Sequence, residues 1–315
     1  MATTFDEIPS TRTVIVTTNI NFNLERLFRG LPLCTNPHSR ARWAYAGLQH
    51  GGITHVEYRR EIRGVPWKPN PRRGKRAQHF FLNSVTMVMV LEASRYDARR
   101  SQTVPVKWKR INAKISHNGR FQLTGCQIDA HFRDFMECML NVLMDPLTTR
   151  SSPLIEGVRP TSVGGGRDCP GLVVATFAVV MCNMDAHLGF QVNRERLDTF
   201  INARTKFISI YETSVNTSVN IKLPCENPHE QYMLRLECPG YGNFRWERKE
   251  YPAYIADWVG ESVIKWKRAY HTFLVFTSGA IIQSSKGQDA KSTFGSLIEV
   301  LRQNRPHIEE RRVVG

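Results

Sequence analysis

The sequence predicts an α+β fold built from two copies of one unit, each with a strand, a helix, several antiparallel strands and a closing helix. The tetrapeptide Lys-Trp-Lys-Arg occurs twice, at Lys107–Arg110 and at Lys265–Arg268. Each copy leads into a strand, a glycine turn, a return strand and an amphipathic run. The two turn glycines, Gly119 and Gly279, lie 160 residues apart, and this offset holds without a gap to the start of the amphipathic run. A rare motif repeated in register with a glycine turn indicates an internal repeat.

The elements of the first copy follow one another along the chain. Thr13–Ile20 is rich in β-branched residues and predicts a strand, and Asn23 is placed to cap the helix that follows. Three further apolar runs predict strands over residues 53–61, 80–91 and 104–116. Asn118 and Gly119 predict a tight hairpin turn in which both central residues have positive φ. Arg120–Cys126 then predicts the return strand.

The closing helix of the first copy has one apolar face. Its apolar residues are spaced at i, i+3, i+4 and i+7, as in a helix that packs one side against a core. These residues are Phe132, Phe135, Met136, Met139, Leu140 and Leu143.

The second copy repeats this order. Leu172–Cys182 predicts its first strand, and Val192–Leu197 opens a helix that matches the one after Asn23. Further strands are predicted over 209–223, 232–237, 244–250, 265–276 and 280–284. Leu297, Ile298 and Leu301 lie on the apolar face of the second closing helix.

The domain boundaries follow from the repeat. We expect a first copy over residues 12–144, a linker rich in proline, glycine and serine over 145–170, a second copy over 171–303 and a tail over 304–315. Each copy also carries an insertion, a basic one at about 35–76 in the first and another at about 225–262 in the second.

Composition restricts the possible partners. The chain has 315 residues, is 41% hydrophobic and carries a net charge of +15, which favours a polyanionic partner, nucleic acid before an anionic membrane. The alternative is a soluble protein whose positive charge has no role in binding. Neither a membrane-spanning stretch nor a secretory signal is visible. The seven cysteines have no zinc or disulfide spacing, so we expect reduced thiols in an intracellular protein.

No catalytic motif is visible. Gly164–Asp168 lacks the Lys-Ser/Thr that would follow in a phosphate-binding loop. Asp-Ala-His occurs at Asp129–His131 and at Asp185–His187, but at positions that are not equivalent in the two copies. We therefore expect neither an enzyme nor a bound cofactor or metal.

The duplicated unit resembles the TATA-box-binding protein (TBP) family. The hairpins Arg120–Gly125 and Val275–Gly279, each followed by a step into the last helix, carry the resemblance, which covers residues 12–303. The pattern is most similar to the divergent TATA-binding-like proteins of nucleocytoplasmic large DNA viruses. The resemblance implies a curved, saddle-shaped sheet with helices on its convex face and a concave face that binds the DNA minor groove.

The resemblance also implies base-step wedges. Phe276 matches an aromatic side chain that unstacks a base step and kinks the duplex. The equivalent position before the first turn is Ser116, which has no ring. Phe81 or Leu82 matches another wedge position in the first copy.

Base contacts are implied at four polar positions. Thr124 and Ser284 match a hairpin hydroxyl that contacts bases. Asn183, together with Asn21 or Asn19, matches a central pair of asparagines. Amides and hydroxyls suit the minor groove, which presents mainly hydrogen-bond acceptors.

Basic residues are candidates for phosphate contacts, because lysine and arginine bind phosphate regardless of base sequence. The lysines of each Lys-Trp-Lys-Arg alternate along a strand and so share a face opposite the tryptophan. Residues 59–76 form a basic loop, for which a nuclear-localisation role at 72–76 and a merely solvated charge run are alternatives. The candidates are Arg120, Lys107, Lys109, Lys265, Lys267, Arg72, Arg73, Lys75 and Arg76.

We expect a transcription factor that binds the minor groove of A·T-rich promoter DNA and recruits general transcription factors or a viral RNA polymerase. The duplication predicts a monomer with an internal pseudo-two-fold axis. Its expected location is the host nucleus or a cytoplasmic viral factory, with packaging in the virion as a further location. The alternative is a saddle-fold scaffold or virion-associated protein that uses the sheet for protein contacts or for non-specific DNA binding.

Overall fold

The computed structural model describes residues 10–34, 51–65, 82–97, 102–145, 153–160, 162–163, 167–168, 171–214, 217–225, 232–250, 270–285 and 290–310. The chain divides into two compact units. The N-unit comprises Thr13–Ala178 and Met233–Lys249, and the C-unit comprises Met1–Arg12, Val179–Tyr232 and Glu250–Gly315. The long strand β11 (Val173–His187) contributes its first half to the N-unit and its second half to the C-unit.

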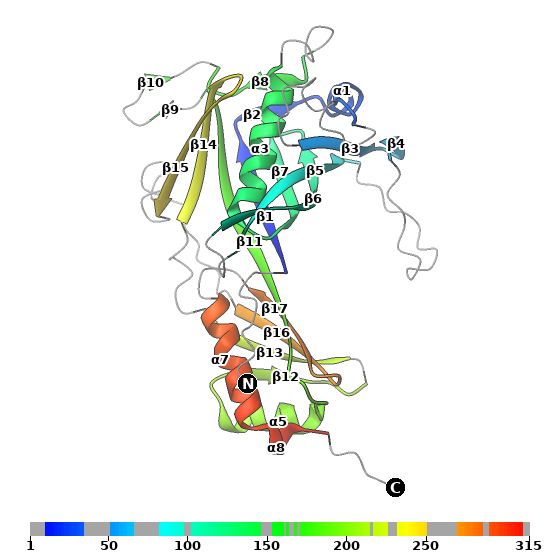
Figure 1. Cartoon of the computed structure of the whole chain (residues 1–315), viewed down its shortest axis with the longest axis vertical. Helices are drawn as coiled ribbons and strands as arrows, with labels where there is room; N and C mark the ends of the chain where they lie inside the picture. Colours follow the sequence, from blue (N-terminus) through cyan, green and yellow to red (C-terminus); the bar gives the residue numbers. More distant parts are fainter. Residues whose placement is uncertain are drawn as a thin grey trace. The chain divides into compact units, whose positions relative to one another are not determined.

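The N-unit is a large sheet with few helices (Figure 1). Its strands are ordered β15-β14-β11-β1-β7-β6-β5-β3-β4, and β2 pairs separately with β8. The elements are β1 (Thr11–Thr18), β2 (Ile20–Phe22), α1 (Leu24–Gly30), β3 (Gly51–Tyr58), β4 (Glu61–Gly64), β5 (Ser84–Asp97), β6 (Gln102–Ser116), β7 (Arg120–Cys126), α3 (Asp129–Met144), β8 (Ile155–Val158), β9 (Ser162–Val163), β10 (Arg167–Asp168), β14 (Tyr232–Gly240) and β15 (Asn243–Glu250).

The core of the N-unit lies between α3 and the sheet. The helix packs against β3, β5, β6 and β7. Every apolar residue predicted for its buried face is buried, so this prediction is confirmed. On the sheet side, Phe22 and Phe121 meet edge to face, with ring centroids 5.8 Å apart.

The C-unit is a smaller sheet with the strand order β12-β13-β16-β17-β11. Its elements are the second half of β11, α5 (Arg194–Arg204), β12 (Ile208–Ile210), β13 (Ser218–Pro224), β16 (Tyr270–Phe276), β17 (Ala280–Ser285), α7 (Ala290–Gln303) and α8 (Arg305–Ile308). Leu197 and Ile201 of α5 join the α7 residues Leu297, Ile298 and Leu301 in one buried cluster with the inner side chains of β13, β16 and β17. The burial of these α7 residues agrees with the predicted closing helix.

The two units share one order of paired strands. In the N-unit the run is β1-β7-β6-β5-β3, and in the C-unit it is β11-β17-β16-β13-β12. The helix after the first strand is also capped alike in both. The side chain of Asn23 accepts from the backbone N–H of Arg26 at 3.1 Å, and that of Asn193 accepts from Arg196 at 3.0 Å. The predicted cap at Asn23 is confirmed.

The predicted geometry of the first hairpin turn was wrong. Gly119 has φ of 75° but Asn118 does not have positive φ, and the turn has three residues between β6 and β7. The backbone N–H of Gly119 donates to the carbonyl of Ser116 at 3.1 Å, as expected of a type I turn followed by one left-handed residue. The two-residue turn with positive φ at both positions is instead Arg59–Arg60, between β3 and β4.

The first residues of the predicted basic loop are therefore ordered as a hairpin. Arg59 and Arg60 form its turn, and the Arg59 guanidinium lies over the ring of Tyr58, 5.0 Å from its centroid. The Arg63 guanidinium donates to the carbonyl oxygens of Phe28 and Arg29 at the end of α1. These contacts satisfy carbonyls that have no partner within the helix. Arg63 is thus a structural cation in this unit.

The predicted linker and the predicted second insertion both contain strands. β8 lies within residues 145–170 and pairs with β2, and Leu154 just before it is buried. β14 and β15 lie within residues 225–262, where alternation predicted strands, and they belong to the N-unit. Their hairpin is attached to α3, because the indole N–H of Trp246 donates to Glu137 at 2.5 Å. The Arg133 guanidinium also lies 4.6 Å from the centroid of that ring.

Two glycines of the C-unit provide a test of this fold. Gly279 and Gly189 both have positive φ, 85° and 88°, but only at Gly279 would an added Cβ meet a backbone atom, the carbonyl oxygen of Phe190. We expect Gly189→Ala to lower the free energy of unfolding by about 1 kcal/mol, the cost of a left-handed alanine. Gly279→Ala should lower it by about 3 kcal/mol, because a clash is added to the strain. Urea unfolding followed by circular dichroism measures the free energy of unfolding of both variants. Equal losses of stability would contradict the close approach of Gly279 to the carbonyl oxygen of Phe190.

Candidate nucleic-acid interface

In the C-unit, one face of the sheet packs on helices and the other does not belong to the core. Along β16, His271, Phe273 and Val275 are buried, whereas Thr272, Leu274 and Phe276 are half-buried. The same alternation occurs in β13 and β17. Since successive side chains of a strand point to opposite faces, the half-buried and exposed set lies on the face opposite α5 and α7. We call this surface the C face.

Strand pairing arranges the C face in rows, because residues directly opposite in antiparallel strands share a face. The first row is Asn183, Ser284, Thr272, Lys222 and Ile208. The second row is Asp185, Ile282, Leu274, Asn220 and Ile210. The third lies at the Gly279 turn and holds Phe276 opposite Ser218.

The C face is apolar with interspersed amides and hydroxyls. Ile208, Ile210 and Ile282 are 48%, 51% and 37% exposed, and Tyr270 at the start of β16 is 39% exposed. Apolar side chains gathered on one exposed surface mark an interaction site. Asp185 is the one carboxylate in the three rows. The face can therefore approach a polyanion with little like-charge repulsion.

Two amides of the C face have an oxygen with no hydrogen-bond partner. The side-chain oxygens of Asn183 and Asn220 are buried and unpaired. An unsatisfied buried polar atom costs about 1–3 kcal/mol, and most such atoms in native proteins have a partner.

The corresponding face of the N-unit is polar and charged. We call it the N face. One of its rows holds Gln122, Lys114, Thr86 and Glu57, and the next holds Thr124, Asn112, Val88 and His55. Ser116 lies opposite Ser84 beside the Gly119 turn, where the C-unit has Phe276 opposite Ser218. By pairing position, Lys114 corresponds to Leu274, and Glu57 corresponds to Ile210.

Electrostatics on the N face centre on Lys114. Partial burial lowers the pKa of its ammonium, and the carboxylate of Glu57 partly offsets this by raising it. A buried cation loses hydration, and a nearby anion returns some of the lost stabilisation. The position that carries an apolar side chain in the C-unit thus holds a charge in the N-unit.

The structure brings together some of the residues that the sequence predicted for DNA binding. Phe276, Ser284 and Asn183 all lie on the C face. Thr124 and Arg120 lie on the N face, because they alternate along β7 with buried residues. The DNA-binding roles of all five stay predictions.

Two predicted residues lie away from these faces. Asn21 is in β2, opposite Gly157 of β8, and so lies outside the large sheet. Its alternative, Asn19, uses its amide to donate to the carbonyls of Arg159 and Leu172, at 2.9 and 2.8 Å, and to accept from the N–H of Val174 at 2.9 Å. These bonds give Asn19 a structural role.

Lys109 also lies off the N face. It shares the helix-facing side of β6 with Ile111 and Ala113, and its Nζ donates to Gln127 at 2.9 Å. Burial lowers its pKa, an effect that the nearby Cys126 opposes. The DNA contact predicted for Lys109 stays a prediction.

The remaining predicted phosphate contacts lie outside the described residues. They are the side chain of Lys107 and the residues Lys265, Lys267, Arg72, Arg73, Lys75 and Arg76. The wedge candidate Phe81 also lies outside, whereas Leu82 is 62% exposed in the turn before β5. The phosphate roles stay predictions.

Sequence reasoning missed several residues of the C face. Alternation within Ser218–Leu223 places Asn220 and Lys222 on one side of a strand, and this signal could have identified them. Ile208 and Ile210 belong to a strand of three residues, which is too short for a pattern to be visible. Ile282 and Thr272 required the register of the second hairpin.

Among the described residues, no helix has the length and hydropathy that crossing a bilayer requires. Within the same ranges, no group of three or more histidine, cysteine, aspartate and glutamate side chains could hold a metal ion.

The pairing of Lys114 with Glu57 gives a direct test of the N face. We expect Glu57→Gln to lower the pKa of Lys114 further, because the substitution removes the anion and leaves the burial. NMR titration of the lysine side chain measures this. Glu61→Gln, in the exposed β4 strand, is the matched control and should leave the pKa unchanged. An unchanged or raised pKa in Glu57→Gln would contradict the proposed geometry.

Comparison with known proteins gives matches among solved structures but none by sequence. No protein-family model matches the sequence, and no curated protein is similar to it. Among solved structures, the chain is similar to Methanococcus jannaschii TBP, with 12% sequence identity and a TM-score of 0.38. The similarity covers 94% of this chain and 97% of that one.

Proposed function

We propose that the chain is a DNA-binding protein that places the open face of its sheet on the minor groove of duplex DNA. The observation that carries this proposal is the C face, where exposed isoleucines alternate with asparagine, serine and threonine beside Phe276. Proteins that bind the minor groove use apolar side chains against base steps together with amide donors. The C face combines both kinds of group.

The chemistry of the groove matches these rows. The minor groove of an A·T pair presents acceptors only, whereas a G·C pair adds the guanine amino group. The amides of Asn183 and Asn220 and the hydroxyls of Ser284 and Thr272 can donate to those acceptors. The apolar side chains between them would meet the guanine amino group without a hydrogen bond. We therefore propose a preference for A·T-rich sites.

Phe276 is the proposed wedge. It is half-buried at the end of β16, and its carbonyl accepts from the N–H of Gly279 at 2.9 Å, which fixes the turn beside it. Unstacking a base step costs on the order of a few kcal/mol, which the larger contact of bent DNA can offset. Because Ser116 takes the corresponding place in the N-unit, we propose one wedge at the hairpins.

The charge of the chain supplies the sequence-independent part of binding. The net charge is +15, and Lys222 lies on the C face while Arg120 and Lys114 lie on the N face. Each phosphate that a cation neutralises releases counterions, so affinity should fall steeply with salt.

The biological setting of this proposal rests on the sequence resemblance to the TBP family. We propose a transcription factor, not an enzyme, that binds promoter DNA as a monomer and recruits general transcription factors or a viral RNA polymerase. It would work where that machinery operates, in the nucleus or in a cytoplasmic viral factory.

A second function is favoured by one observation. Asp185 lies in the second row of the C face, and Glu57 lies on the N face beside Lys114. Carboxylates on a binding surface oppose DNA and suit a protein partner. The alternative is therefore a scaffold that uses the sheet for protein contacts.

Binding to labelled duplexes tests the proposal. We expect the chain to bind an A·T-rich duplex more tightly than a G·C-rich one in fluorescence anisotropy. Phe276→Ala should weaken A·T binding about tenfold, which corresponds to about 1.4 kcal/mol. Tyr241→Ala, which removes an exposed aromatic ring from the β14–β15 turn, is the control and should bind as the unaltered chain does.

The salt dependence separates the alternatives. Repeating the titration over a range of salt concentrations gives the number of phosphates contacted from the slope of log affinity. No binding at low salt would refute the proposal. If the affinity falls steeply with salt but depends neither on Phe276 nor on A·T content, the chain is a non-specific DNA binder.

A further inference from the structure

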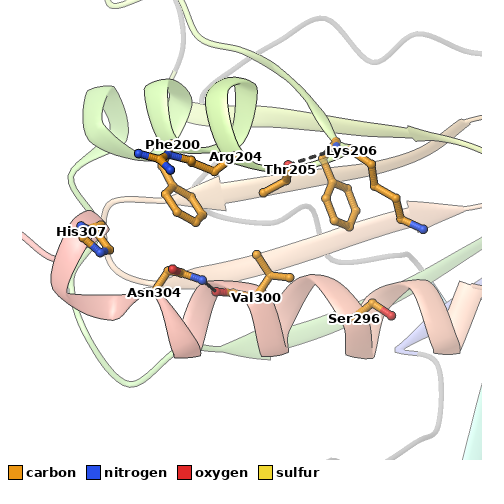
Figure 2. Close-up of a pocket in the computed structure, with 9 residues that line it drawn as sticks. Phe200, Arg204, Thr205, Lys206, Ser296, Val300, Asn304 and His307 are labelled. Carbon is orange, nitrogen blue, oxygen red and sulfur yellow. Dashed lines mark hydrogen bonds between the residues drawn. The ribbon is translucent and has the colours of Figure 1, made fainter.

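We propose that a pocket on the helical side of the C-unit binds an acidic peptide segment of a partner protein through one buried apolar side chain. The pocket lies between α5 and the α7–α8 segment, and Figure 2 shows side chains from both sides pointing into it. It has a volume of about 530 Å³. Its lining comes from α5 and the loop after it on one side, and from α7, α8 and their junction on the other.

The inner walls of the pocket are apolar. Phe200 and Phe207 come from the α5 side, and Val300 comes from α7. Phe207 is 5% exposed and meets Phe273 of the sheet edge to face, with ring centroids 6.1 Å apart. The pocket floor is therefore continuous with the core of the unit, and it suits an aromatic or aliphatic side chain.

The rim of the pocket is basic on its α5 side. Arg204 and Lys206 line it there, His307 lines it on the α8 side, and all three are exposed. None of the lining residues is a carboxylate. Arginine binds carboxylates through paired hydrogen bonds, and lysine adds a point charge. Positive charge beside an apolar slot suits a ligand with negative charge beside an apolar group.

Hydrogen bonds and ring stacking hold the walls in place. The Thr205 hydroxyl donates to the carbonyl of Ile201 at 2.8 Å and accepts from the N–H of Phe207 at 3.1 Å. The rings of Phe200 on α5 and His307 on α8 stack, with an interplanar angle of 5° and centroids 6.3 Å apart. The Asn304 amide donates to the carbonyl of Val300 at 2.9 Å. A site held this way needs little rearrangement to bind.

The shape of the pocket favours a peptide over nucleic acid. A duplex presents phosphates along an extended backbone and meets cations that lie along a strip or groove. Here the two cations lie beside an apolar hollow, which a phosphate would not fill. A peptide in which acidic residues flank an aromatic one supplies both the charge and the filling group. Because the site lies on the helical side of the sheet, it stands apart from the proposed DNA interface.

Binding of a synthetic probe tests this proposal. The probe is a fluorescein-labelled peptide of aspartates around a single phenylalanine, titrated with the full chain in fluorescence anisotropy. We expect Arg204→Glu to weaken binding at least about tenfold, since it reverses a charge at the rim. Arg196→Glu, the same change on the same helix but outside the pocket, should weaken binding by less than about twofold. Circular dichroism of both variants checks that the unit stays folded.

The apolar requirement is tested separately. A probe with serine in place of phenylalanine has no apolar side chain to fill the pocket. The unaltered chain and Phe200→Ala should therefore bind this probe with equal affinity. Equal weakening by Arg204→Glu and Arg196→Glu would overturn the proposal, since any surface charge would then suffice. A loss of duplex DNA binding in Arg204→Glu, with peptide binding unchanged, would overturn it in favour of a phosphate contact. Neither outcome depends on whether the C face binds DNA.

Discussion

The packing of α5 and α7 on one side of the C-unit sheet determines the chemistry of its other side. Leu197 and Leu297 meet Ile221 and Phe273 in one buried cluster. Burying each such side chain contributes about 1.5–3 kcal/mol, and a register slip of one residue would move the whole set to the other face. The core therefore fixes the register, and the register decides which residues of β13, β16 and β17 form the rows of the C face. Phe276 shares its face with Ser284 because Phe273 and Val275 are buried.

The two units use one order of strands to present different surfaces. At corresponding positions the C-unit has Leu274 and Ile210 where the N-unit has Lys114 and Glu57. The hairpin ends in Phe276 in one unit and in Ser116 in the other.

Much of the fold could be predicted because its signals are local. The apolar spacing of residues 129–144 indicates a helix, and Asn23 is a capping residue by its position alone. The hairpin geometry was missed because Asn-Gly also fits a three-residue loop, in which only the glycine needs positive φ. The contacts of Lys109 and Asn19 could not be predicted, because their hydrogen-bond partners are distant in the sequence. Lys109 donates to Gln127, and Asn19 bonds to backbone groups of residues 159–174. Ile208 and Ile210 could not be predicted, since a strand of three residues is too short to show an alternation of apolar and polar residues.

The isoleucine methyl groups offer the most direct test that the C face is the binding surface. In the chain labelled at isoleucine methyls, NMR spectra recorded during titration with an A·T-rich duplex report each position separately. We expect the signals of Ile208, Ile210 and Ile282 to shift or broaden, and those of Ile298 and Ile308, which are buried on the helical side, to stay unchanged. Changes confined to other methyl groups, with Ile208, Ile210 and Ile282 unmoved at saturation, would contradict this expectation.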